Sequence, residues 1–119
     1  MDENFMFPRE ERIRLSDKGY KKICALVNER DGNRCKLCGA TMGLQHHHVR
    51  FRSAYGSDTI NNLILLCSSC HSIYAHGKKE KGYREMFENY LAGDYCKQFE
   101  KDHEKKLNSI YKQYRRKKR

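Results

Sequence analysis

Two Cys-x-x-Cys pairs, Cys35-Lys36-Leu37-Cys38 and Cys67-Ser68-Ser69-Cys70, decide the fold of this chain. Each pair can present two sulfurs from one side of a tight turn, and four sulfurs complete a tetrahedral zinc site with no position left for water. We therefore predict a structural zinc ion that clamps residues 39–66 as a loop. The alternative is two unrelated pairs of small buried cysteines. A thioredoxin-like redox role lacks the βαβ pattern that should surround it.

The composition supports a small metal-stabilised domain. The chain has 119 residues, of which 38% are hydrophobic and 34% charged, so it allows one domain with a helical extension. Because so thin a core gives little apolar burial, metal binding would supply much of the folding free energy. The other two cysteines, Cys24 and Cys96, are expected at apolar core positions of helices. A net charge of +10 favours a polyanionic partner, with nucleic acid the first candidate.

Neither a membrane nor secretion is expected. The longest apolar stretch, around residues 63–67, is far shorter than the roughly 20 residues that cross a bilayer. The beginning, Met1-Asp2-Glu3-Asn4, has no basic region followed by an apolar one. We therefore predict a cytoplasmic protein whose thiols stay reduced.

Hydrophobic periodicity and turn residues indicate alternating helices and strands. Ser16 is a good N-cap for a helix that ends at Asp31-Gly32-Asn33, and residues 1–15 form an arm before it. The remaining expected elements are strands over 44–51 and 63–66, a helix from Cys67 to about His76-Gly77, an amphipathic helix over 83–91, a break at Gly93-Asp94 and a helical stripe over 96–114.

The histidines lie at the places where chemistry is expected. His46-His47-His48 is inside the clamped loop, and His71 follows Cys70 directly. Imidazole can ligate a divalent ion or exchange a proton near neutral pH. Phosphodiester cleavage needs both a base that activates water and a cation that stabilises charge on the phosphate and the leaving oxygen.

Four pieces of sequence then occur in a specific order: His47-His48-Val49, Gly56-Ser57-Asp58, Asn62-Leu63 and Cys67 to His71. Together they resemble the HNH endonuclease motif, over roughly residues 12–79, and the small zinc-clamped phage or bacterial type is the most similar. The resemblance implies an α+β fold, a zinc-stapled ββα-metal (His-Me finger) core flanked by helices. It also implies cleavage or nicking of double-stranded DNA with one catalytic divalent cation.

The resemblance assigns a role to four residues. His48 matches the general base, and His47 matches the first ligand of the catalytic ion. Asn62 matches the middle residue, which holds the loop and helps to orient the base. His71 matches the final ligand. Two imidazoles suit Mn²⁺, Ni²⁺ or Zn²⁺ as readily as Mg²⁺.

The triple histidine leaves its register open. The usual distance from base to asparagine in the family selects His48, since 62 − 48 = 14, and we follow that spacing. A regular strand would instead place His46 and His48 on one face and His47 on the other. His46 is then an accessory residue or a phosphate contact, or simply an exposed strand histidine.

A second histidine, His76, follows His71 by five residues. On an α-helix five residues are about 140° apart, so His76 reaches the metal only if the helix has already ended at Gly77.

Basic residues surround this region. Arg50 and Arg52 would share one face of the strand and bind phosphates that flank the scissile bond, and Lys78 and Lys79 extend the positive surface. The tail 112–119 is read as a helix along the duplex or as a disordered basic arm, with affinity that falls as salt rises. The stripe over 96–114 packs on the domain or forms a dimer seam.

We predict three parts: an N-terminal arm (1–15), an HNH nuclease domain with structural zinc (16–79) and a basic helical C-terminal extension (80–119). The alternatives to a nuclease are a non-catalytic zinc-dependent DNA-binding module and an accessory protein of a phage packaging machinery. The sequence leaves the oligomeric state, the target sequence and the choice between nicking and double-strand cutting open.

Overall fold

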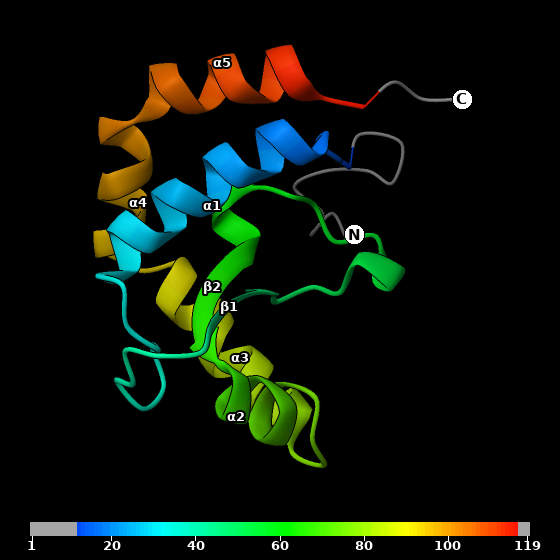
Figure 1. The fold of residues 1–119 in the computed structure, drawn as a ribbon, viewed down its shortest axis with the longest axis vertical. Coiled ribbons are helices and arrows are strands. Elements are labelled where there is room, and N and C mark those ends of the chain that lie inside the picture. Colours follow the sequence, from blue (N-terminus) through cyan, green and yellow to red (C-terminus); the bar gives the residue numbers. More distant parts are fainter. Residues whose placement is uncertain (1–11, 117–119) are drawn as a thin grey trace.

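The computed structural model describes residues 12–116 and has an α+β fold around a two-stranded antiparallel hairpin (Figure 1). Its elements, in chain order, are α1 (Asp17–Asp31), β1 (Leu44–His48), the 3-10 turns η2 (Arg52–Ala54) and η3 (Ile60–Asn62), β2 (Leu63–Cys67), α2 (Ser68–Cys70), the π-helical turn η4 (His71–Ala75), α3 (Glu80–Leu91), α4 (Asp94–Asp102) and α5 (Glu104–Tyr114). The predicted fold class is confirmed.

Helix α1 has the caps that its sequence predicts. Ser16 Oγ accepts a hydrogen bond from Gly19 N at 3.4 Å, which satisfies one of the free N–H groups at the helix start. Gly32 has a left-handed φ of 71°, which costs little without a Cβ, and its N–H bonds back to the last turn. The helix therefore stops at Asp31, just before the first cysteine pair.

The last two residues of α1 hold the hairpin in place. Arg30 and Asp31 are both buried, and Arg30 Nε lies 2.8 Å from Asp31 Oδ1. Arg30 also donates to Ile60 O at 2.7 Å, and Asp31 Oδ2 accepts from Leu65 N at 3.0 Å. Buried charges are tolerated when they are paired and hydrogen-bonded in this way. The pair thus fixes β2 against the end of α1.

Strand alternation gives the hairpin two different faces. His47 pairs with Ile64 and His48 with Leu63, and residues directly opposite each other share a face. The core on the α3 side includes Val49, Ile64, Leu66, Phe87 and Leu91. The core on the α1 side includes Leu15, Ile23, Val27, Leu63, Leu65, Leu107 and Ile110. Neighbouring histidines of β1 therefore face different cores.

The C-terminal helices complete both cores. Helix α5 lies along α1 (Figure 1), and the two approach closely at Gly19, where a Cβ would lie 2.3 Å from Tyr114 Cβ. Of the two readings of the 96–114 stripe, packing on the domain is therefore the one that these helices adopt. The expected break at Gly93-Asp94 is confirmed, and a second break occurs at His103.

The two ends of the described chain meet. Leu15 is buried and pairs with Arg115 in an antiparallel bridge. Residues 1–11 of the predicted arm and residues 117–119 of the predicted tail lie outside the described residues. The division at residues 15 and 79 stays a prediction.

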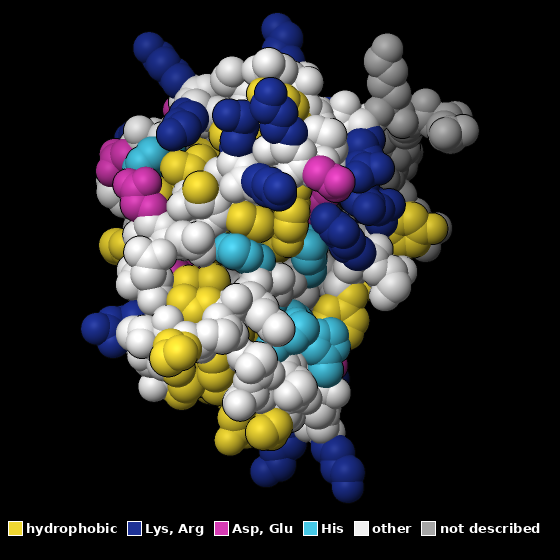
Figure 2. Space-filling model, viewed as in Figure 1, with side chains coloured by type: hydrophobic (Ala, Val, Ile, Leu, Met, Phe, Trp, Pro, Cys, Tyr) yellow, Lys and Arg dark blue, Asp and Glu magenta, His cyan; other side chains and the backbone are white. Residues whose placement is uncertain are grey.

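The surface is unevenly charged. In Figure 2, many Lys and Arg side chains gather over α1 and α5, and histidine side chains lie across the middle of the same face. No helix in the described part of the chain is long and apolar enough to span a membrane.

Candidate active site

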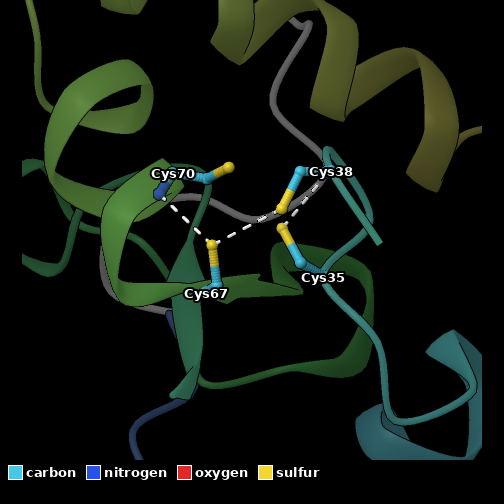
Figure 3. Close-up of side chains that lie close together, drawn as sticks. All are labelled: Cys35, Cys38, Cys67 and Cys70. Carbon is cyan, nitrogen blue, oxygen red and sulfur yellow. Dashed lines mark hydrogen bonds between the residues drawn. The ribbon is translucent and has the colours of Figure 1, made fainter. Parts of the chain in front are cut away.

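Four cysteine side chains converge where the loop after α1 meets the end of β2 and α2 (Figure 3). Their sulfur atoms all lie within 4.8 Å of one another, and Cys38 Sγ is 3.6 Å from Cys67 Sγ. Zinc with Zn–S bonds of about 2.3 Å holds tetrahedral sulfurs about 3.8 Å apart, whereas a disulfide needs about 2.05 Å. The cysteines 35, 38, 67 and 70 therefore fit the predicted structural zinc ion.

Backbone N–H groups point at the ligand sulfurs. Leu37 N donates to Cys35 Sγ and Cys70 N donates to Cys67 Sγ, both at 3.4 Å. Burial alone would raise the pKa of Cys35, but hydrogen bonds from the surrounding backbone lower it to about 6. Because the thiolate is the form that binds metal, these turns favour the ligating state of the sulfur.

Three imidazoles form a second cluster: His47 from β1, His71 at the start of η4 and His76 directly after its end. Their ligand nitrogens lie within 4.8 Å of one another, and Nε2 of His71 is 3.2 Å from Nε2 of His76. A tetrahedral ion with metal–nitrogen bonds of about 2.0–2.1 Å holds two nitrogens about 3.3 Å apart. This histidine triad therefore has the donor set and spacing for one divalent cation.

His76 belongs to the triad because the segment before it is not an α-helix. The angle of about 140° that an α-helix would give does not apply, since η4 is a π-helical turn, in which hydrogen bonds join residues five apart. The turn ends at Ala75, before Gly77. A Cβ on Gly77 would lie 1.9 Å from Ile73 O, so only a glycine allows the backbone to pass this close to the turn after it ends.

Burial keeps the His47 and His71 imidazoles of the triad in their neutral form. Burial lowers the pKa of His47 to about 3, and the neighbouring His71 and His76 act in the same direction. Burial also lowers the pKa of His71. The His47 ring additionally has Phe51 and Phe87 at 5.9 and 6.0 Å between centroids. Neutral imidazole is the form that ligates a metal, so His47 and His71 have their ring nitrogens available as ligands near neutral pH.

His48 does not join the triad. Its Nε2 lies 2.8 Å from Asp58 Oδ1, and its ring stacks on Tyr20 with 5.8 Å between centroids. The regular strand alternation is kept, so His46 and His48 face α1 while His47 faces the triad. His47 and His48 therefore lie on opposite faces of the strand, as in a regular strand. The role of His48 as base stays a prediction.

Asp58 is the polar centre that sequence reasoning missed. It is fully buried, and its Oδ2 accepts from Leu15 N at 2.9 Å while Oδ1 accepts from Arg52 Nε at 3.1 Å. Burial alone would raise the pKa of Asp58, but the hydrogen bonds from His48 and Leu15, with the charge of Arg52, lower it to about 2. The Gly56-Ser57-Asp58 turn is a signal in the motif, but its spacing alone does not indicate a contact with His48.

Asn62 holds the loop that leads from β1 to β2. Its Oδ1 accepts from Arg50 N at 2.8 Å, and its Nδ2 donates to Arg50 O at 3.1 Å and to Ser57 O at 2.9 Å. One amide therefore closes both sides of the loop, as expected for a residue that positions its neighbours.

His46 is partly buried with Nε2 2.7 Å from Asn28 Oδ1, so its reading as an exposed strand histidine is wrong.

The predicted DNA contacts are spread over three places. Strand β1 ends at His48, so Arg50 and Arg52 do not share a strand face as expected. Arg50 Nε donates to Ala54 O at 2.9 Å, and Arg52 contacts Asp58. Lys78 and Lys79 are exposed between η4 and α3. Their binding to DNA stays a prediction.

The comparison with protein families agrees with this geometry. Residues 35–77 match the family model for HNH endonucleases. That range begins at the first zinc-site cysteine and includes the whole histidine triad, His48 and Asn62. No curated protein and no solved structure matches the chain significantly. Residues 35–77 of the chain therefore correspond to an HNH endonuclease domain.

Proposed function

We propose that this protein is a divalent-metal-dependent endonuclease that hydrolyses phosphodiester bonds of double-stranded DNA. The observation that carries the proposal is the convergence of His47, His71 and His76, whose ligand nitrogens lie within 4.8 Å inside the HNH domain. Three imidazoles from two segments of the chain are a donor set for metal, and a module that only binds DNA has no need of it.

The triad would hold the catalytic cation. A bound divalent ion supplies positive charge that polarises the phosphate and stabilises the leaving oxygen. Three imidazoles favour borderline ions such as Zn²⁺, Ni²⁺ or Mn²⁺ over Mg²⁺, which prefers oxygen ligands. His47 is buried and His76 is exposed, so the cluster is reachable from solvent on the η4 side.

His48 is proposed as the general base, with Asp58 as the residue that orients it. An ionised carboxylate can only accept, so the hydrogen bond to Asp58 places the proton of the neutral ring on Nε2. Nδ1 is then the acceptor that takes a proton from water. The carboxylate also stabilises the imidazolium that results, as a buried aspartate does in other His–Asp pairs.

The two faces of β1 can serve one phosphodiester because β1 is paired on one side alone. In the described hairpin its neighbour is β2, and side chains of both faces flank its other edge. DNA lying along this edge would meet the triad on one side and His48 on the other. Asn62 keeps the adjoining loop closed, which fixes the end of β1 that carries His48.

Supercoiled plasmid tests the proposal directly. We expect the zinc-loaded protein to relax or linearise it when Mn²⁺, Ni²⁺, Zn²⁺ or Mg²⁺ is added, one ion per reaction, and excess EDTA to stop the reaction. His48→Ala and His71→Ala should each lower the cutting rate by at least about 100-fold with the zinc-site fold intact. His103→Ala is the matched control, since His103 lies between α4 and α5 outside the triad.

The competing functions give different results. A DNA-binding module retards the plasmid on a gel and leaves its supercoils intact with every ion. A packaging accessory is expected to retain a protein partner at high salt, which a phosphate-dominated complex does not. Cutting that is unchanged in His48→Ala would place the base elsewhere.

A further inference from the structure

Four arginines meet beside the His48–Asp58 pair. Arg14 Nε lies 3.6 Å and Arg52 Nη2 lies 3.0 Å from the Asp58 carboxylate. Arg12 Nη1 donates to Arg52 O at 3.1 Å. The positive charges of Arg12, Arg52 and Arg116 all act on the Arg14 guanidinium, which places the four groups in one neighbourhood. We name Arg12, Arg14, Arg52 and Arg116 the arginine cluster.

The fold itself brings these like charges together from three distant segments. Arg116 N donates to Arg14 O at 2.7 Å, next to the bridge between Leu15 and Arg115. Asp58 N donates to Ile13 O at 2.8 Å, which attaches the same strand-like segment to the loop that carries Arg52. Gathering guanidinium groups costs Coulomb energy. Backbone pairing, and not free side-chain motion, sets this arrangement.

The cluster carries more positive charge than its described surroundings neutralise. Among residues 12–116, the cluster forms ion pairs with Asp58 and with Asp17. The Asp17 side chain is 97% exposed and lies 3.6 Å from Arg116, and so exposed an ion pair offsets little of the positive charge. Arg14 Nε is buried without a hydrogen-bond partner among the described groups. Burial lowers the pKa of Arg14, and the three neighbouring arginines act in the same direction.

We infer that the arginine cluster binds a backbone phosphate of the DNA duplex next to the one that is cleaved. The inference rests on the proposed function, because it places this phosphate on the α1 side of β1, where His48 lies. The sequence predicts DNA contact for Arg52 and, as part of the tail 112–119, for Arg116. Arg12 and Arg14, from the segment before α1, are added by the structure. In Figure 2, Lys and Arg side chains crowd the face on which the histidines are visible.

The side-chain geometry favours phosphate over a monovalent counter-ion. Arg52 lies over the Tyr20 ring at 5.0 Å, and Arg12 lies over the Tyr55 ring at 5.1 Å. Stacked guanidinium groups have fewer conformations to lose, and their planar forks match two phosphate oxygens at once. Tyr20 stacks on both His48 and Arg52, so one aromatic ring positions the proposed base and an arginine of the cluster.

The test measures duplex binding apart from cutting. A fluorescein-labelled duplex of about 20 base pairs is titrated with full-length zinc-loaded protein, without other divalent ions, and anisotropy is read at several salt concentrations. We expect the double variant Arg12→Gln/Arg116→Gln to bind at least about 10-fold more weakly near 0.1 M salt. The slope of log Kd against log salt should fall by up to about 1, because the cluster is proposed to neutralise one phosphate.

The matched control removes the same charge at the other end of α5. Lys105 and Lys106 are exposed there, so Lys105→Gln/Lys106→Gln should change Kd by less than about 2-fold. An equal weakening in both double variants would mean a general charge effect and overturn the inference, as would unchanged binding by the arginine variant. Arg12→Lys/Arg116→Lys covers the case in which the glutamine variant misfolds: it keeps the charge and should keep the salt slope while Kd rises.

The inference and the proposed function fail in different assays. A protein that binds duplex through the arginine cluster but never cuts plasmid contradicts the nuclease and leaves the phosphate site. A protein that cuts plasmid, with an arginine double variant that binds as the wild type does, contradicts the phosphate site and leaves the nuclease. Thermal unfolding of each variant shows that the fold is retained.

Discussion

Nε2 of His71, the first residue of a π-helical turn, lies 3.2 Å from Nε2 of His76, the residue directly after that turn. An α-helix would hold these two side chains about 140° apart, so the local backbone geometry creates a ligand pair from a five-residue spacing. π-turns are often found at functional sites. The relationship makes His76 a full member of the triad and not an accessory.

We expect His76→Ala to weaken the second metal site and spare the first. The wild-type chain should bind two zinc equivalents, one at the cysteines and one at the triad. Removal of one of three ligands should weaken the triad site by at least about 10-fold. A competition titration with a chromophoric chelator measures both steps. His103→Ala should leave both steps unchanged, and equal affinity in His76→Ala and wild type would remove His76 from the site.

Zinc binding at the four cysteines should be required for the folded state. Cys35→Ser is expected to lose the tightly bound zinc and the cooperative unfolding transition, because metal binding supplies much of the folding free energy. Cys24→Ala, at a buried cysteine outside the cluster, should keep the zinc and cost about 1 kcal/mol. Circular dichroism with metal analysis follows both. A native-like transition in metal-free Cys35→Ser would contradict a structural role for the ion.

Asp58 should make the unfolding free energy of the protein fall at acidic pH. Its pKa in the folded protein, about 2, lies below the ordinary 3.8, so the ionised form stabilises the fold. That contribution, roughly 2 kcal/mol, is complete above pH 4 and is lost as pH falls toward 2. Asp58→Asn should therefore be less stable than wild type at pH 7 by a similar amount, and the gap should close in acid. Urea unfolding of both proteins at each pH cancels the acid-induced release of zinc that they share.

The close packing of helix α5 on α1 should require a glycine at residue 19. Gly19→Ala places a Cβ 2.3 Å from Tyr114 Cβ, so α5 must shift, and we expect a decrease of about 1–3 kcal/mol in unfolding free energy. Gly82→Ala is the matched control, because nothing lies within 4 Å of a Cβ there in helix α3. It should be neutral or stabilising by about 0.5–1 kcal/mol. Urea titration compares the two, and equal effects would show that α5 has room to move.

The sequence predicted those features that depend on local pattern. Ser16 and Gly32 bound α1, and Gly93-Asp94 separates α3 from α4, because caps and breakers act within a few residues. The cysteine spacing predicted a four-sulfur cluster, which the geometry of residues 35, 38, 67 and 70 confirms as a fit for zinc.

What the sequence could not predict depends on contacts between distant segments or on the helix type. Residues 71–75 read as an ordinary helix, and only their π-turn brings His76 to His71. The contact of Asp58 with His48 joins residues on two sides of a loop, with no periodic signal. The buried pair Arg30–Asp31 looks like a polar helix end in sequence, yet it holds both η3 and β2.

The bridge between Leu15 and Arg115 joins the segment before α1 to the segment after α5. Leu15 N is also the donor that reaches Asp58 Oδ2 at 2.9 Å. Truncation of the chain after residue 110 would release the strand-like segment at the opposite terminus and, through it, the carboxylate that orients His48. Removal of residues 111–119 should thus lower the proposed DNA-cleaving activity, although neither His48 nor any residue of the histidine triad lies in that segment.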